Sequence, residues 1–148
     1  MVFKRTTSDN PDFQKLVALL DADLKIRDGE DHAFYAQYNK SATLNEVLVC
    51  YENELAVGCG ALRRYEEKTV EIKRMFVLPE QRGKGIAQKI LKELETWAKQ
   101  LGYAHCILET GVNQPEAIGL YKKTAYTITP NYGQYKHMEN SVCMSKTI

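Results

Sequence analysis

A short turn before a long helix pattern carries the clearest chemical signal in the chain. Its sequence is Gln-Arg-Gly-Lys-Gly, and an amphipathic segment begins next, at Ile86. The first N–H groups of a helix have no acceptor within the helix, and the helix dipole adds partial positive charge there. Gly83 and Gly85 have no Cβ, so an anion can approach the backbone. With the charges of Arg82 and Lys84, the turn is expected to cradle a phosphate group.

Two well-known phosphate-binding motifs do not account for this turn. A P-loop requires G-x-x-x-x-G-K-[ST], and a dinucleotide-binding turn requires G-x-G-x-x-G after the first strand of its unit. The stretch Gln81–Ala87 matches neither pattern. The turn therefore either serves a different phosphate ligand or is a solvated basic turn without a ligand.

The segments on both sides of the turn predict how it is positioned. Apolar residues at helical spacing predict a helix that ends at Gly102; they are Ile86, Ile90, Leu91, Leu94, Trp97, Ala98 and Leu101. A strand is expected before the turn, from Val70 to Leu78, and another after the helix, over residues 104–110. This connection makes the two strands parallel or neighbouring in one sheet.

The rest of the chain extends this unit into one α/β domain over residues 1–148. Strands are expected at 2–7, 47–51 and 55–61, the last two joined by a tight turn at Asn53. Helices are expected within 8–28, at 32–40 and from Pro115, and a hairpin-like pair ends the chain. The order β-α-α-β-β-β-α-β-α-β-β predicts a mixed, mostly antiparallel central sheet flanked by helices.

One irregularity appears in the strand that leads to the turn. Val70 and Ile72 share one face, whereas Met75 and Val77 have the opposite parity. Either a one-residue β-bulge brings all four to one side, or the strand is buried on both faces.

Composition limits the class of protein. The chain has 148 residues, 44% hydrophobic and 26% charged, with a net charge of +1. This is typical of a globular domain and favours neither nucleic acid nor a membrane as partner. No apolar run could span a bilayer, and the first residues resemble no secretory signal. The four cysteines form no C-x-x-C pair, so we expect reduced, buried residues in a cytoplasmic protein without a metal.

The phosphate-binding turn resembles a motif of the GNAT N-acetyltransferases, R/Q-x-x-G-x-G/A. Arg82 fills its first position, Gly85 the central glycine and Ala87 the last. The order of the expected elements also resembles that of the family over nearly the whole chain.

A second stretch, "QPEAIGLYKKTAY", resembles the family's pattern Asn-x-x-Ala-x-x-Leu-Tyr followed by a Gly-Phe-like pair. Ala117, Leu120 and Tyr121 fit this pattern. Gln114 stands where Asn is common, and Ala-Tyr replaces Gly-Phe at 125–126.

The resemblance implies acetyl-CoA as cosubstrate. Its pyrophosphate would lie on Arg82, Gly83, Lys84, Gly85, Ile86 and Ala87. Its pantetheine arm would bond to the backbone of Met75, Phe76 and Val77, in a gap between two splayed strands. Gln114 would contact the arm near the thioester. A bulge near Arg74 would suit that gap.

Acetyl transfer to an amine needs a base for the amine, a donor for the oxyanion and a proton donor for the departing thiolate. The resemblance suggests Tyr121 as the proton donor, although it could simply pack against the cofactor. Glu71 is the candidate base, because some family members place a carboxylate there; the alternative is a surface glutamate near Lys73. Glu109 is a second carboxylate, and either one could bind a cationic substrate.

Aromatic and charged residues outside the two motifs are the candidates for the acceptor site. We expect a small-molecule primary amine, bound near Tyr35, Arg74, Glu109 and Tyr132. Tyr38 and Tyr135 could help to shape the site, and Arg63, Arg64 or Arg74 could attract a carboxylate.

An alternative function is a non-catalytic module that senses acyl-CoA, although such a module needs neither Tyr121 nor Glu71. A nucleic-acid-binding role is disfavoured, because the chain has no basic stripe with interleaved aromatics. A homodimer is possible.

Overall fold

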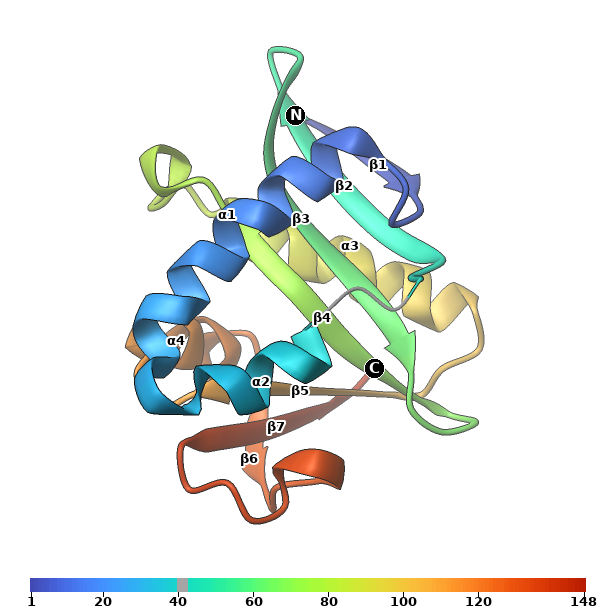
Figure 1. The fold of residues 1–148 in the computed structure, drawn as a ribbon. Helices are drawn as coiled ribbons and strands as arrows, with labels where there is room; N and C mark the ends of the chain where they lie inside the picture. Colours follow the sequence, from blue (N-terminus) through green and yellow to red (C-terminus); the bar gives the residue numbers. More distant parts are fainter. Residues whose placement is uncertain (40–42) are drawn as a thin grey trace.

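The computed structural model describes residues 1–39 and 43–148, excluding the side chains of residues 37–39. Its strands and helices follow the predicted order (Figure 1). They are β1 (Val2–Thr6), α1 (Pro11–Asp28), α2 (His32–Asn39), β2 (Glu46–Glu52), β3 (Leu55–Arg64), β4 (Thr69–Val77), α3 (Ile86–Gln100), β5 (His105–Gly111), α4 (Pro115–Lys123), β6 (Thr127–Thr129) and β7 (Ser141–Thr147). Short 3-10 turns occupy Gly29–Asp31 (η1), Pro79–Gln81 (η2) and Gly133–Tyr135 (η3).

The seven strands form one sheet in the order β1-β2-β3-β4-β5-β7-β6. All neighbours are antiparallel except β4 and β5, which are parallel. The predicted mixed, mostly antiparallel sheet is therefore confirmed, as is the pairing of the last two strands. The hairpin between β2 and β3 turns at Asn53 and Glu54, both with positive φ, as in the turns that match the twist of paired strands.

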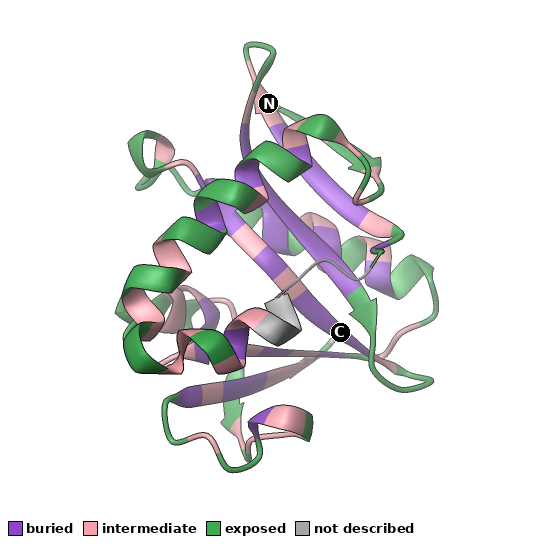
Figure 2. Cartoon of the chain, in the orientation of Figure 1, coloured by how far each residue is buried: buried purple, intermediate pink, exposed green. Residues whose placement is uncertain are grey.

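Helices cover both faces of the sheet (Figure 1). On one face, Phe13, Leu16 and Leu20 of α1 pack against β2, β3 and β4. Asn10 caps this helix, because its side chain accepts from the N–H groups of residues 12 and 13. On the other face lie the buried residues of α3, with Leu94 fully buried. The central strands β2–β4 are consequently buried along most of their length (Figure 2).

Two glycines let α3 lie close to the sheet. A Cβ on Gly58 would lie 2.7 Å from Ile90 Cδ1 and 3.0 Å from the backbone oxygen of Phe76. A Cβ on Gly60 would lie 2.7 Å from Leu94 Cδ1. The beginning of α3, and therefore the turn before it, is thus held at a fixed height above the sheet.

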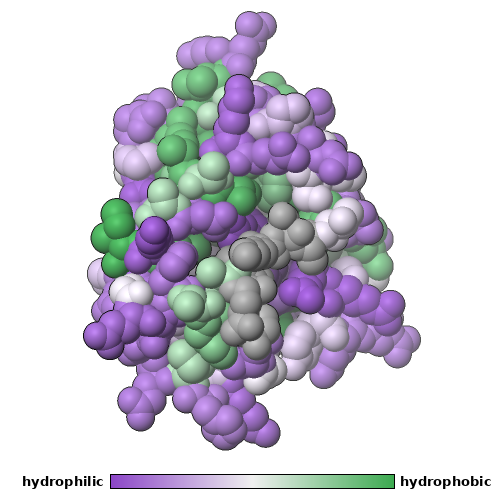
Figure 3. All heavy atoms as spheres, in the orientation of Figure 1, coloured by the Kyte–Doolittle hydropathy of each residue, from purple (hydrophilic) through white to green (hydrophobic). Residues whose placement is uncertain are grey.

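The outer surface has no dominant apolar patch in the view of Figure 3, where hydrophobic atoms are scattered among hydrophilic ones. The four cysteines are buried and free, as predicted. None of the described helices is long and apolar enough to cross a membrane.

The irregularity in β4 is a β-bulge. Cys59 pairs with Phe76, but Ala61 pairs with Lys73, so two steps along β3 match three along β4. Arg74 takes up the extra residue with φ 58°, an uncommon left-handed conformation for a residue other than glycine. The bulge brings Val70, Ile72, Met75 and Val77 to the α3 side, as one alternative predicted. The other alternative also holds, because Phe76 is buried on the α1 side.

The bulge lies beyond the point where β4 and β5 stop pairing. The two strands are paired only from Thr69 to Glu71 on β4 and from His105 to Ile107 on β5. A bulge bends its strand and ends regular pairing. The remaining length of β4, up to Val77, has no strand beside it on the β5 side among the described residues, so the expected splay is confirmed.

Close packing under α3 gives a first prediction. Gly58→Ala should lower the free energy of unfolding by about 1–3 kcal/mol, because the added methyl group meets a core side chain and a backbone oxygen. Urea unfolding checks this. In Gly119→Ala the same methyl group meets no atom within 4 Å on an exposed helix, so that control should gain about 0.5–1 kcal/mol. Equal effects of both changes would contradict the packing argument.

Candidate active site

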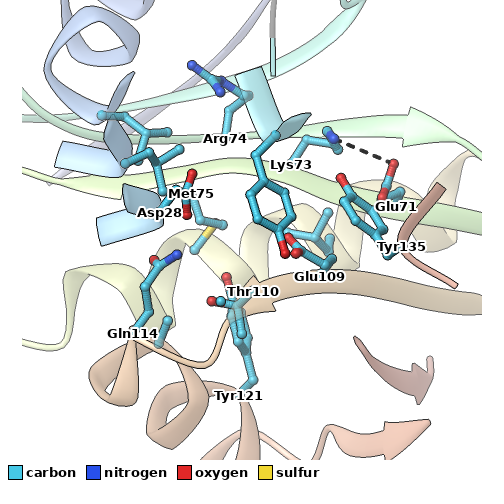
Figure 4. Close-up of a pocket in the computed structure, with 16 residues that line it drawn as sticks. Asp28, Glu71, Lys73, Arg74, Met75, Glu109, Thr110, Gln114, Tyr121 and Tyr135 are labelled. Atoms are coloured by element: carbon cyan, nitrogen blue, oxygen red, sulfur yellow. Dashed lines mark ion pairs between the residues drawn. The ribbon is translucent and has the colours of Figure 1, made fainter. Parts of the chain in front are cut away.

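Two cavities open on either side of the gap between β4 and β5. The larger has a volume of about 290 Å³ and extends from β4 to the turn before α3. The smaller has a volume of about 110 Å³ and lies between β4, β5, α1 and α2 (Figure 4). Both are lined by the same five residues where they meet: Leu20, Met75, Gln114, Ala117 and Tyr121. The gap therefore connects a long groove with a small, more polar chamber.

The turn at one end of the groove has the geometry of an anion cradle. Gly83 and Gly85 adopt positive φ angles of 79° and 78°, and a Cβ at either position would meet no atom within 4 Å. Gly85 is the N-cap of α3, and no side chain caps the helix there. The N–H groups of the first helical turn thus face an open space that suits an anion.

The two cations of the turn behave differently. Arg82 folds back onto β4, where its Nε donates to the Val77 carbonyl at 3.1 Å and its guanidinium lies 5.7 Å from the centre of the Phe76 ring. Arg82 also lines the groove. Lys84 is exposed, and its Nζ donates to Gln81 Oε1 at 3.0 Å. The structure therefore fixes Arg82 beside the groove and leaves Lys84 near the solvent.

Tyr121 lies at the junction of the two cavities. It comes from α4, is 6% exposed, and packs edge-on against Tyr126 with ring centres 5.7 Å apart. Burial raises the pKa of its phenol, and the charge of Glu109 adds to this effect. The phenol therefore keeps its proton at neutral pH and can act as a hydrogen-bond or proton donor at the junction.

Glu109 lines the small chamber from β5. Burial raises the pKa of its carboxyl group from 4.5 to about 7, although the Ser141 hydroxyl and Lys73 oppose this effect. Ser141 Oγ lies 2.8 Å from Glu109 Oε2. A carboxyl group that titrates near pH 7 can both accept and release a proton under neutral conditions.

Glu71 lines the same chamber from β4, but its surroundings differ. Tyr132 donates a hydrogen bond of 2.6 Å to Glu71 Oε2, and Lys73 Nζ lies 3.9 Å from Oε1. With only 5% of its surface exposed, Glu71 is not a surface-facing glutamate, so that alternative is wrong. Burial lowers the pKa of Lys73, while Glu71 opposes this effect.

Of the other residues predicted for the acceptor site, some line the chamber and others do not. Tyr35 and Tyr135 line the chamber, whereas Tyr132 lies behind Glu71 and does not line it. Arg74 lines the chamber, but its Nη2 is 2.6 Å from Asp21 Oδ1. Arg63 and Arg64 are exposed and line neither cavity. The side chain of Tyr38 lies outside the described part of the chain.

Four polar residues of the site were not predicted from the sequence: Asp28, Lys73 and Thr110 line the chamber, and Ser141 donates to Glu109. Asp28 ends α1, and burial raises the pKa of its carboxyl group. Lys73 directly precedes the bulge at Arg74, so the face of the sheet to which its side chain points could not be predicted from alternation along the strand. Ser141 is far from Glu109 in the chain, and only the pairing of β5 with β7 brings them together.

The described part of the chain contains no cluster of metal ligands. Within residues 1–39 and 43–148, no three or more His, Cys, Asp or Glu side chains form a group that could hold a metal ion.

Comparisons with known proteins identify the family of the chain. Residues 13–126 match the model of the acetyltransferase (GNAT) family. A protein from Azospirillum brasilense named IAA acetyltransferase is 36% identical over 102 residues, which are 68% of this chain and 67% of that protein. A crystal structure described as an acyl-CoA N-acyltransferase from Klebsiella pneumoniae is 29% identical with a TM-score of 0.83, covering 99% of this chain and 96% of that one.

A third similarity concerns the fold alone. A GNAT family acetyltransferase from Elizabethkingia anophelis, solved with acetyl-CoA bound, is 21% identical with a TM-score of 0.71. The two chains are covered to 99% and 97%.

The raised pKa of Glu109 predicts how stability depends on pH. Between pH 4.5 and about 7 the folded protein keeps a proton that the unfolded chain loses. Each rise in pH within this window therefore lowers the free energy of unfolding. At ~1.4 kcal/mol for each pH unit between the two pKa values, the total is on the order of 3 kcal/mol.

Glu109→Gln removes this titration. Its free energy of unfolding, measured by urea at a series of pH values, should rise relative to the unmodified protein as pH increases through this window. Parallel curves for the two proteins would contradict the assignment of the raised pKa to Glu109.

Proposed function

Because the chain belongs to the acetyltransferase (GNAT) family, we propose that it transfers the acetyl group of acetyl-CoA to a primary amine of a small molecule, by direct attack of the amine on the thioester. The observation that carries this proposal is the meeting of the two cavities at Tyr121 and Gln114. One cavity leads to an anion cradle and the other holds carboxyl groups. A donor and an acceptor that entered from opposite sides would meet at this junction.

The residues present fit the cosubstrate. The open glycine turn and Arg82 would hold the diphosphate, and the unpaired part of β4, from Met75 to Val77, would contact the pantetheine arm. Gln114 stands at the start of α4 and lines both cavities, so it would lie near the thioester. When bound, acetyl-CoA supplies the activated acetyl group, and the protein's residues move the protons.

Tyr121 is the proposed proton donor to the departing sulfur. Its position at the junction supports this role, and its raised pKa keeps the phenol protonated. The neighbouring Tyr126 cannot take the role, because its hydroxyl donates to Glu95 Oε2 at 2.8 Å, away from both cavities.

Of the two carboxyl groups, Glu109 is the stronger candidate for the base. Its carboxyl group titrates near neutral pH, and its one side-chain hydrogen-bond partner among the described residues is Ser141. Glu71, the candidate from the sequence, already accepts from Tyr132 and lies beside Lys73. We therefore assign proton removal to Glu109. Glu71 instead balances the positive charge of Lys73.

The chamber also supports a small acceptor that carries positive charge. Its volume of about 110 Å³ suits a few non-hydrogen atoms. Three carboxyl groups line it, whereas Arg74 is already paired with Asp21. An ammonium group entering the chamber would meet the carboxyl groups of Asp28 and Glu109, and it must lose a proton before it attacks.

Release of free thiol from acetyl-CoA tests the proposed function. With a panel of monoamines, diamines and amino acids, we expect release with at least one amine and none without an acceptor. Binding is checked separately by thermal unfolding, because CoA at about a hundred times its dissociation constant should add ~2.7 kcal/mol. Stabilisation by CoA without thiol release on any acceptor would favour the sensor function. The absence of both stabilisation and thiol release would contradict both functions.

The role of Tyr121 gives a further prediction. Tyr121→Phe should lower kcat by about 10²–10⁴-fold, the usual contribution of a positioned acid, while thermal stabilisation by CoA is retained. Tyr126→Phe is the matched control, because it removes a hydroxyl group outside both cavities, and its kcat should stay near the original. An unchanged kcat in Tyr121→Phe at saturating substrate would remove the assignment.

A further inference from the structure

Two buried hydroxyl groups form a chain that ends on Glu109. Tyr35 Oη lies 2.7 Å from Ser141 Oγ, and Ser141 Oγ lies 2.8 Å from Glu109 Oε2. Tyr35 and Ser141 are each 6% exposed. The three residues come from α2, β7 and β5, so segments that are distant in the sequence meet at one carboxyl group.

The direction of these hydrogen bonds follows from the chemistry of the groups. An ionised carboxylate can only accept, so Ser141 must donate its single hydroxyl proton to Glu109. The proton between Tyr35 and Ser141 must then come from Tyr35. The tyrosine thereby polarises the serine, which strengthens the bond to the carboxylate.

We propose that Tyr35 and Ser141 are positioning residues that stabilise the ionised, proton-accepting form of Glu109. This inference rests on the proposed function, in which Glu109 is the base. Burial alone would favour a neutral carboxyl group, which cannot remove a proton from an ammonium group. A charge-assisted hydrogen bond from Ser141 acts in the opposite direction. The balance keeps a useful fraction of the base ionised at neutral pH.

Other charged and titratable groups also act on Glu109, but none replaces this donor. Lys73 favours the ionised form, whereas Asp28 and Glu71 oppose it. Tyrosines 121 and 135 and Cys143 have raised pKa values and remain neutral near pH 7. Among the described residues, Ser141 is the side chain whose hydrogen bond favours the ionised form of this carboxyl group.

The proposal is tested by titrating Glu109 directly, which requires no acceptor. Protein labelled with carboxyl-13C glutamate is followed by NMR, and the Glu109 resonance is assigned by its loss in Glu109→Gln. Ser141→Ala should raise the pKa of Glu109 by on the order of one pH unit, the size expected for a hydrogen bond to a charged group. Tyr35→Phe should give a smaller rise.

Ser145→Ala is the matched control, because it makes the same change on the same strand, at the position that pairs with Ile107, whereas Ser141 pairs with Gly111 and reaches Glu109 through its side chain. The pKa of Glu109 in Ser145→Ala should equal that of the unmodified protein. An unchanged or lowered pKa in Ser141→Ala would overturn the proposal.

Kinetics with the most active amine of the panel separate this proposal from the proposed function. Below the pKa of the base, Ser141→Ala should lower kcat/KM by about tenfold, and the loss should vanish at high pH. A merely structural role would lower kcat/KM at every pH. If Glu109→Gln keeps full kcat at all pH values, Glu109 is not the base, although the NMR shift in Ser141→Ala would still show the hydroxyl chain.

Discussion

The early end of pairing between β4 and β5 is the constraint on which the site depends. Three residue pairs hold the two strands together, and the bulge at Arg74 then bends β4. Backbone groups that would otherwise bond to a neighbouring strand are left facing a gap. The two cavities open on either side of that gap, and Tyr121 of α4 lies where they meet. A continuous sheet would close this passage, whatever the residues around it.

Close packing of α3 on the sheet fixes the position of the glycine turn relative to this gap. Gly58 and Gly60 allow α3 to approach the sheet closely, so the glycine turn stands at a set distance from the unpaired part of β4. The cradle, the groove and Tyr121 therefore belong to one fixed framework. For a ligand with a diphosphate at one end and a reactive group at the other, this framework sets the distance between the two binding positions. Such an arrangement suits the acetyltransferase family to which the chain belongs.

Local patterns in the sequence were sufficient to predict most of the fold and the glycine turn before α3. The periodicity of α1 and α3, the turn at Asn53 and the glycines before Ile86 are all encoded by neighbouring residues. The proposed division of roles between Glu71 and Glu109 is not encoded in this way, because it depends on the burial and the hydrogen-bond partners of the two carboxyl groups. Tyr132 and Ser141 reach these carboxyl groups from the C-terminal part of the chain. The bulge remained one of two alternatives, since parity alone also permits a strand buried on both faces.

The most direct test of the account is a crystal structure of the protein with acetyl-CoA. It should show the diphosphate within hydrogen-bonding distance of the N–H groups at the start of α3, the arm along Met75–Val77, and the thioester sulfur beside the Tyr121 hydroxyl. Acetyl-CoA bound at another surface, or a diphosphate away from the glycine turn, would contradict the account.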